Sequence, residues 1–356
     1  MKSIKFAAVA IGVLVFSGCS LASQKAPTGP ITFTFSQSLW KSADDGTTWE
    51  VRNKGLGKAN TTNISVLSMA VNPYDGNSAY VGLRSGGIME TKDGGDTWSF
   101  INFQSEKVYG LALDPVTGRT LYASGVWQGT GKLFKTEDDG ATWKEIYTSP
   151  SAGPLVISLM IDKKNPSVLY VTTSDNQVLK SVDAGTSWKN IYAAPDPVLK
   201  IVQDVANENL LYALTTSGNI LRSKDGGANF EEITSNTNDA LKSFGSSNSA
   251  IVEADPSVAN RVYLAGSAGI LVSDDAGNKW RLIPTLNKAD TFPVKALAIN
   301  PQNPKELICG AAQAIYKSVD GGNNWSTFQF DNKMALRVIK YDSNDPTQLY
   351  LGFDNN

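Results

Sequence analysis

Short runs of alternating apolar and polar residues recur along the chain, separated by clusters of Gly, Pro, Asn and Asp. The run VLSMAV (66–71) is followed by a turn and by a second run, SAYVGL (78–83), and a similar pair returns as VKALAI (294–299) and ELICGA (306–311). Alternation with a period of two, rich in β-branched and aromatic residues, is typical of β-strands. Since no stretch beyond residue 30 shows a sustained helical period, the pattern predicts an all-β fold.

One eight-residue phrase, Ser/Thr-x-Asp-x-Gly-x-x-Trp, returns seven times between these strands. The copies begin at residues 42, 91, 136, 181, 223, 273 and 318, and only Phe230 departs from Trp at the last position. A period in the forties with turn residues in every copy predicts repeated units of four short strands, which are the blades of a β-propeller. The aspartates of the seven copies are Asp44, Asp93, Asp138, Asp183, Asp225, Asp275 and Asp320.

The two ends of the chain predict how the ring of blades closes. The last segment, VIKYDSNDPTQLYLGF (338–353), supplies two strands and ends before an eighth copy of the phrase, whereas SLWKSADDGTTWEV (38–51) supplies the other two strands of a unit. If these strands share one blade, no sheet edge is left open at the junction. We therefore expect residues 31–356 to form a single propeller of seven four-stranded antiparallel blades.

The repeated phrase resembles the Asp-box, or BNR repeat, of sialidases, tandem-propeller xyloglucanases, sortilin-like receptors and the photosystem II assembly-factor family. This resemblance implies a structural hairpin turn between the third and fourth strands of each blade. Aspartate can accept backbone N–H bonds in such a turn, glycine supplies a positive φ, and the aromatic residue can fill the gap between blades. We interpret the seven aspartates as structural rather than catalytic or calcium-binding, because no copy has the glutamate of an EF-hand loop.

Composition excludes several kinds of chemistry. The chain has no histidine, a net charge of −2 and a pI near 5.4, and its Lys and Arg residues form no run. Without histidine, Ser-His-Asp and Cys-His catalysis and His-ligated metals are ruled out. We expect no metal, no cofactor and no nucleic-acid partner, and we interpret Cys309 as a buried strand thiol.

The first 18 residues have the features of an export signal. Lys2 and Lys5 precede an apolar stretch at 6–16, which is too short to span a bilayer. The next segment, VFSGC, resembles the bacterial lipobox, which implies cleavage before Cys19 and lipid attachment to that residue. Ser20 implies sorting to the outer membrane or cell surface, and residues 19–30 read as a flexible tether.

Glycoside hydrolysis by a pair of carboxylates is the enzyme chemistry that survives these exclusions. The segment AYVGLRSGGIMET (79–91) is similar to one of the xyloglucanases, but Arg84 occupies the position of their catalytic aspartate. We therefore predict no catalytic residue. Resemblance to the photosystem II assembly factors implies a monomeric, envelope-anchored module that binds a protein partner; the alternative is a carbohydrate-binding or glycoside-hydrolysing surface protein.

Candidate binding residues belong to the face opposite the repeated turns. Six of the eight tryptophans close copies of the phrase and Trp40 immediately precedes one, so Trp127 alone falls outside the repeat. We expect it in an extended Gly-rich loop at 124–131, where it would stack on a sugar or anchor a protein partner. The alternative is that it folds over the central channel or packs against Arg84 of the preceding blade. Arg84 itself, Asp175 and Asn176 are further candidates on this face.

Overall fold

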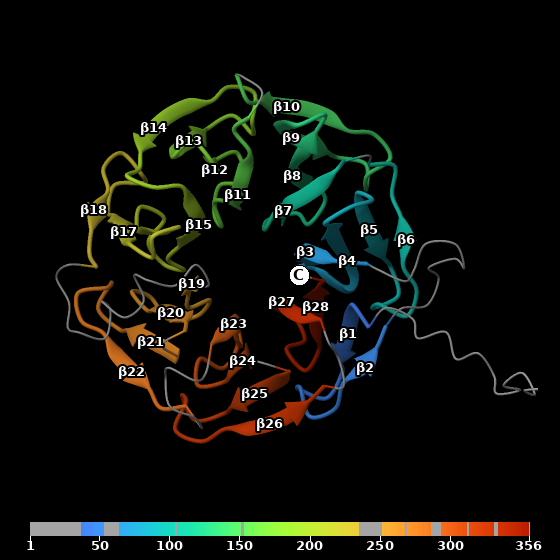
Figure 1. The fold of residues 1–356 in the computed structure, drawn as a ribbon, viewed down its shortest axis with the longest axis vertical. Coiled ribbons are helices and arrows are strands. Elements are labelled where there is room, and N and C mark those ends of the chain that lie inside the picture. Colours follow the sequence, from blue (N-terminus) through green and yellow to red (C-terminus); the bar gives the residue numbers. More distant parts are fainter. Residues whose placement is uncertain are drawn as a thin grey trace, which may run out of the picture. The chain divides into compact units, whose positions relative to one another are not determined.

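The computed structural model describes residues 37–52, 64–103, 105–150, 153–234, 251–267, 269–285, 293–311, 313–330 and 334–355. These residues form seven sheets of four antiparallel strands, arranged around a central axis (Figure 1). The predicted all-β fold with seven four-stranded blades is confirmed. The expected export signal, Cys19 and the tether lie outside the described residues.

We number the blades I to VII along the chain, and the strands within each blade run from the innermost to the outermost. Blades I and II contain β3 (Val66–Asn72), β4 (Asp75–Leu83), β5 (Ile88–Thr91), β6 (Ser99–Phe100), then β7 (Lys107–Leu113), β8 (Leu121–Trp127), β9 (Thr130–Thr136), β10 (Lys144–Thr148). Blades III and IV contain β11 (Val156–Ile161), β12 (Leu169–Thr173), β13 (Gln177–Ser181), β14 (Lys189–Ala193), then β15 (Val198–Gln203), β16 (Leu211–Thr215), β17 (Ile220–Ser223), β18 (Glu231–Glu232).

Blades V and VI contain β19 (Ile251–Ala254), β20 (Val262–Gly266), β21 (Gly269–Ser273), β22 (Arg281–Ile283), then β23 (Val294–Ile299), β24 (Leu307–Ala311), β25 (Ala314–Ser318), β26 (Ser326–Gln329). Blade VII combines the two ends of the chain, as predicted, in the sheet order β2 (Glu50–Val51), β1 (Leu39–Ser42), β28 (Leu349–Asp354), β27 (Ala335–Tyr341). In its central register Trp40 lies opposite Leu351, so the ring closes between strands more than 300 residues apart.

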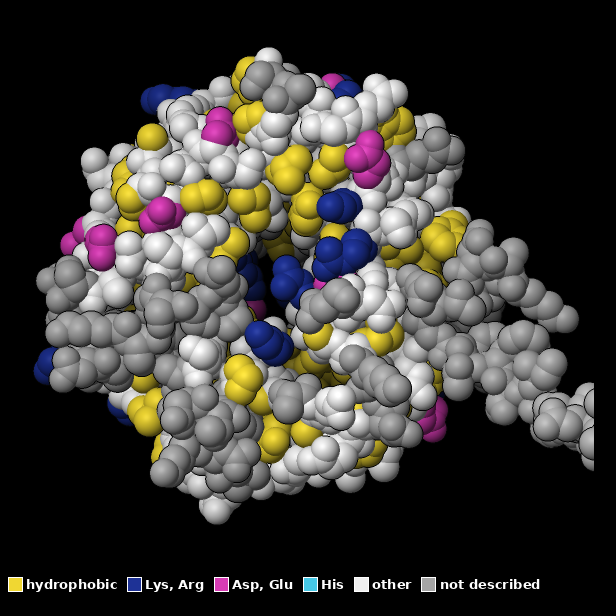
Figure 2. Space-filling view, viewed as in Figure 1, with side chains coloured by type: hydrophobic (Ala, Val, Ile, Leu, Met, Phe, Trp, Pro, Cys, Tyr) yellow, Lys and Arg dark blue, Asp and Glu magenta, His cyan; other side chains and the backbone are white. Residues whose placement is uncertain are grey.

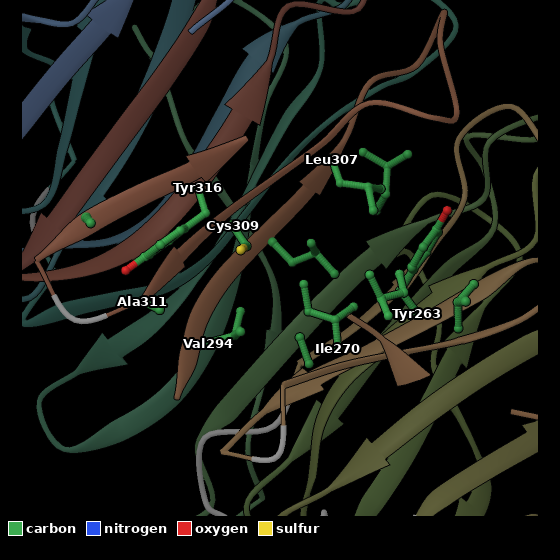
Figure 3. Close-up of a cluster of buried hydrophobic side chains, with 13 residues drawn as sticks. Tyr263, Ile270, Val294, Leu307, Cys309, Ala311 and Tyr316 are labelled. Atoms are coloured by element: carbon green, nitrogen blue, oxygen red, sulfur yellow. The ribbon is translucent and has the colours of Figure 1, made fainter. Parts of the chain in front are cut away.

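The hydrophobic core lies between neighbouring blades. The second strand of a blade is buried along its whole length in most blades, because both faces of its sheet pack against other sheets. Figure 3 shows one interface, where Tyr263 and Ile270 of blade V meet Val294, Leu307 and Cys309 of blade VI. Burial raises the pKa of the Cys309 thiol, which is wholly enclosed by apolar side chains.

Each repeated phrase forms the tight turn between the third and fourth strands of its blade. In blade III, Asp183 accepts bonds from the Ser187 amide (2.8 Å), the Ser187 hydroxyl (2.6 Å) and the Ser181 hydroxyl (2.7 Å). The buried oxygen of Ser181 in turn accepts the amide of Gly185 at 2.9 Å. Gly185 has a φ of 88°, which favours glycine.

A second turn, between the first and second strands, is also repeated in every blade. A side-chain oxygen there accepts the amide two residues further on, and the acceptors are Asn72, Asp114, Asp162, Asp204, Asp255, Asn300 and Asp342. Backbone bonds join the two kinds of turn within a blade, such as Ala184 N to Ser167 O at 2.9 Å. We call the face that carries both turns the turn face and the opposite one the loop face.

Candidate binding site on the loop face

The hairpin of β8 and β9 is the longest on the loop face. Both strands have seven residues, whereas the corresponding strands of blades III, V and VI have five. Gln128 and Gly129 form the tip, with φ values of 50° and 73°, as in the tight turns that suit twisted strands. Trp127 is the last residue of β8 and lies opposite Thr130.

The expectation of an extended loop at 124–131 is therefore wrong, and its glycines explain why. A β-carbon at Gly125 would lie 2.4 Å from the backbone oxygen of Lys107, and one at Gly131 would lie 2.4 Å from that of Pro154. Both glycines allow neighbouring chain segments to pack closely against the hairpin. The Gly-rich composition thus reflects crowding around two strands rather than an irregular loop.

Aromatic side chains hold Trp127 in place. Its ring, which is partly buried, lies 5.9 Å from that of Phe134 on β9, and Phe134 packs edge-on against Phe103 at 5.3 Å. Phe103 also contacts Trp143, which closes a copy of the repeated phrase, at 4.4 Å. The orientation of Trp127 is therefore set by contacts that continue into the core between blades I and II.

A cavity of about 380 Å³ opens beside this tryptophan, between blades I and II. Its lining residues are Gly86, Phe103, Ser105, Glu106, Trp127 and Gln128. The Ser105 hydroxyl is 2.9 Å from the carbonyl oxygens of both Lys107 and Val126, which ties the wall of the cavity to the hairpin. The cavity thus combines an aromatic wall with an exposed carboxylate and an exposed amide, from Glu106 and Gln128. Sequence reasoning missed Phe103 and Glu106 because they belong to the irregular link between blades.

Arg84 lies at the junction of blades I and VII. Its Nε donates to Asp354 Oδ1 at 2.9 Å, and its Nη2 forms a second bond to Oδ2 of the same carboxylate. Asp354 ends β28, and only 5% of its side chain is exposed, against 42% for Arg84. Hydrogen bonding to Asp354 raises the pKa of Arg84. The two-point contact joins the last strand of the chain to the first complete blade.

Asp175 and Asn176 form the tip of the β12–β13 hairpin in blade III. The Asp175 carboxylate accepts the Thr173 hydroxyl, and the Asn176 amide group donates to the Pro195 carbonyl at 3.3 Å. Asn176 has a φ of 69°, which a tight turn requires. These bonds give both residues a role inside their own blade and the link that follows it. Neither lines the cavity beside Trp127.

In the described part of the chain, no three Cys, Asp or Glu side chains come together in a way that would hold a metal ion. The same described residues include no helix of the length and apolarity needed to cross a bilayer.

The fold and this site define a seven-bladed β-propeller with an aromatic-walled cavity on its loop face. The chain belongs to the DUF6242 beta propeller domain family, whose model matches residues 116–340. The sequence is also similar to that of a probable oligoxyloglucan-reducing end-specific xyloglucanase of Neosartorya fischeri. The two are 28% identical over 130 residues, which are 30% of this chain and 16% of that protein. A xyloglucanase of Hypocrea jecorina is 26% identical over 141 residues, which are 39% of this chain and 16% of that protein. The matches thus span about a sixth of these curated relatives.

Solved structures of two kinds share the fold. The GH74 xyloglucanase of Xanthomonas campestris superposes with a TM-score of 0.62 at 17% identity, over 82% of this chain and 51% of its own. YCF48 of Cyanidioschyzon merolae superposes with a TM-score of 0.60 at 14% identity, over 82% of this chain and 96% of its own. YCF48 bound to D1 peptide superposes with a TM-score of 0.60 at 18% identity, over 82% of this chain and 93% of its own.

Proposed function

We propose that this propeller is a non-catalytic binding module that holds a protein partner on its loop face. The observation that carries the proposal is the extended β8–β9 hairpin, which positions a partly exposed tryptophan at the rim of a preformed cavity. A tryptophan fixed by packing, with one face open, is typical of the residues that contribute most to protein interfaces. The likeness to whole YCF48 chains, one of them bound to a peptide, supports the same reading.

The carboxylates of the loop face favour binding over catalysis. Hydrolysis of a glycoside requires two carboxyl groups on either side of one bond. Among the described residues, Glu106 is the one carboxylate that lines the cavity. Elsewhere on this face Asp175, Asp196 and Asp354 bond to Thr173, Ser217 and Arg84.

Photocrosslinking tests this proposal directly. A photoreactive residue at Gln128, on the hairpin tip, should give a protease-sensitive adduct when the full chain is exposed to its native envelope. The matched control is the same group at Val182, which is 66% exposed in a repeated turn on the opposite face. Trp127→Ala should abolish the Gln128 adduct without unfolding the protein, whereas equal adducts from both positions would overturn the proposal.

A glycan is the second candidate ligand, and the same cavity favours it. The wall formed by Phe103 and Trp127 could stack on a sugar ring, and Ser105, Glu106 and Gln128 could bond to its hydroxyls. The sequence similarity to xyloglucanases supports this alternative. An adduct from Gln128 that glycosidases shorten and proteases leave intact would establish it in place of the protein partner.

Export and lipid anchoring complete the proposal. Residues 1–18 carry a charged start and an apolar core, and VFSGC places a cysteine where lipobox proteins are modified. We therefore expect Cys19→Ala to release the chain from membranes and to leave its unfolding midpoint unchanged. Membrane association or fatty-acid labelling that persists in the variant would contradict lipid attachment at Cys19.

A further inference from the structure

The central channel of the ring contains ionisable side chains that belong to neither kind of turn nor to the cavity. Lys200, Glu253 and Lys340 come from the innermost strands of blades IV, V and VII. Lys200 and Glu253 form an ion pair between neighbouring blades, and Lys340 lies within electrostatic range of both. Because two cations share one carboxylate, this cluster has one positive charge in excess.

Lys340 is half-buried on the innermost strand β27. Burial lowers the pKa of Lys340, Glu253 raises it and Lys200 lowers it further. A cation in this position costs free energy unless an anion neutralises it.

Basic side chains also gather where the channel opens on the face drawn in Figure 2. Lys295 and Arg337 lie at the same kind of place in the innermost strands β23 and β27, each at the register shift near the start of its strand. Both residues are exposed. Several positive charges around a narrow opening attract anions toward it.

We propose that the channel is a binding site for an anion of the size of a phosphate or carboxylate group, held by Lys340 and Lys200. Lys295 and Arg337 favour its entry, and Glu253 competes with it for Lys200. The anion is either a free ion or an acidic group of a bound polypeptide. The site is separate from the cavity beside Trp127, so it does not depend on the function proposed above.

Thermal unfolding in inorganic phosphate tests the proposal with the full chain. Relative to chloride at equal ionic strength, phosphate should raise the melting temperature in a saturable way, because a ligand that binds only the folded state stabilises it. Lys340→Met should abolish the saturable rise in melting temperature that phosphate causes. The control is Lys189→Met, which removes the same charge from an exposed position on outer strand β14 and should keep the full response.

Glu253→Gln provides a second test, in which the variant should bind phosphate more tightly than the wild type. Removing the competing carboxylate frees Lys200, and we expect phosphate to bind about tenfold more tightly by titration calorimetry, since one nearby charge has an effect of this order. No saturable response in either the wild type or Glu253→Gln would overturn the proposal. So would an undiminished response in Lys340→Met.

A glutamate-rich hexapeptide then distinguishes the two sources of the anion. If it displaces phosphate from the wild type but has no effect on Lys340→Met, the channel accepts an acidic group of a polypeptide. If phosphate binding is unchanged by the peptide, the channel takes a free small anion.

Discussion

The turn face and the loop face of this propeller are built in opposite ways. On the turn face, every blade repeats the same two turns, and the same kinds of hydrogen bond close each of them. On the loop face the hairpins differ: blade II extends its strands to Trp127, whereas blade III ends in a turn at Asp175 and Asn176. Repetition therefore marks residues that build the blade, and departures from it mark residues available for binding.

Arg84 is the residue that most directly challenges this division, because it departs from the repeat and yet has a structural partner. Replacing it with methionine would leave the Asp354 carboxylate, 5% exposed, without its cation. We expect a loss of about 3 kcal/mol in the free energy of unfolding, at the low end for buried pairs because Arg84 is itself partly exposed. Urea unfolding measures this loss.

Arg337→Met is the matched control for Arg84→Met. Arg337 is exposed on the same face, and its replacement should change stability by less than about 0.5 kcal/mol. Unchanged stability in Arg84→Met together with a lost Gln128 adduct would reverse our assignment. Arg84 would then be a binding residue, as the sequence predicted.

The repeated features of the fold could be predicted from the sequence, because each is encoded seven times. Blade number, strand order and the shared blade VII all follow from the spacing of the phrase and from the incomplete units at each end. The second turn carries a clear signal in the sequence only where proline follows the polar residue, as at Asp114. Asp162 makes the same bonds to its turn but is followed by Lys163, so composition alone does not mark that turn.

The candidate site could be predicted only in part, since its contacts depend on how different blades meet. Trp127 stood out as an exception to the repeat, but its neighbours Phe103 and Glu106 come from a link with no pattern of its own. The partner of Arg84 lies 270 residues away across the ring junction. Nothing local in the sequence indicates that pairing.

Within the turn face, Ser181 and Asp183 allow a sharper test of which repeated residue matters most. Ser181→Ala removes the buried hydroxyl that accepts the Gly185 amide, and an unsatisfied buried N–H should cost about 1 to 2 kcal/mol. Asp183→Asn should cost less, because the Ser187 groups that bond to it are exposed. Urea unfolding of both variants, with the Gln128 adduct retained, would support this order. A larger loss in Asp183→Asn would show that the aspartate, not the hydroxyl, holds the turn.

The smallest effect expected is the acid dependence of the same turn. Hydrogen bonding from the Ser187 hydroxyl and amide lowers the pKa of Asp183 to about 2, below the usual value of about 4 in an unfolded chain. A carboxylate with a lowered pKa in the folded state stabilises the fold fully above pH 4, and the contribution disappears as the pH falls toward 2. The difference in urea midpoint between wild type and Asp183→Asn should therefore be constant from pH 7 to pH 5 and shrink between pH 4 and pH 2. A difference that stays constant down to pH 2 would mean that the charge of Asp183 contributes nothing to the turn.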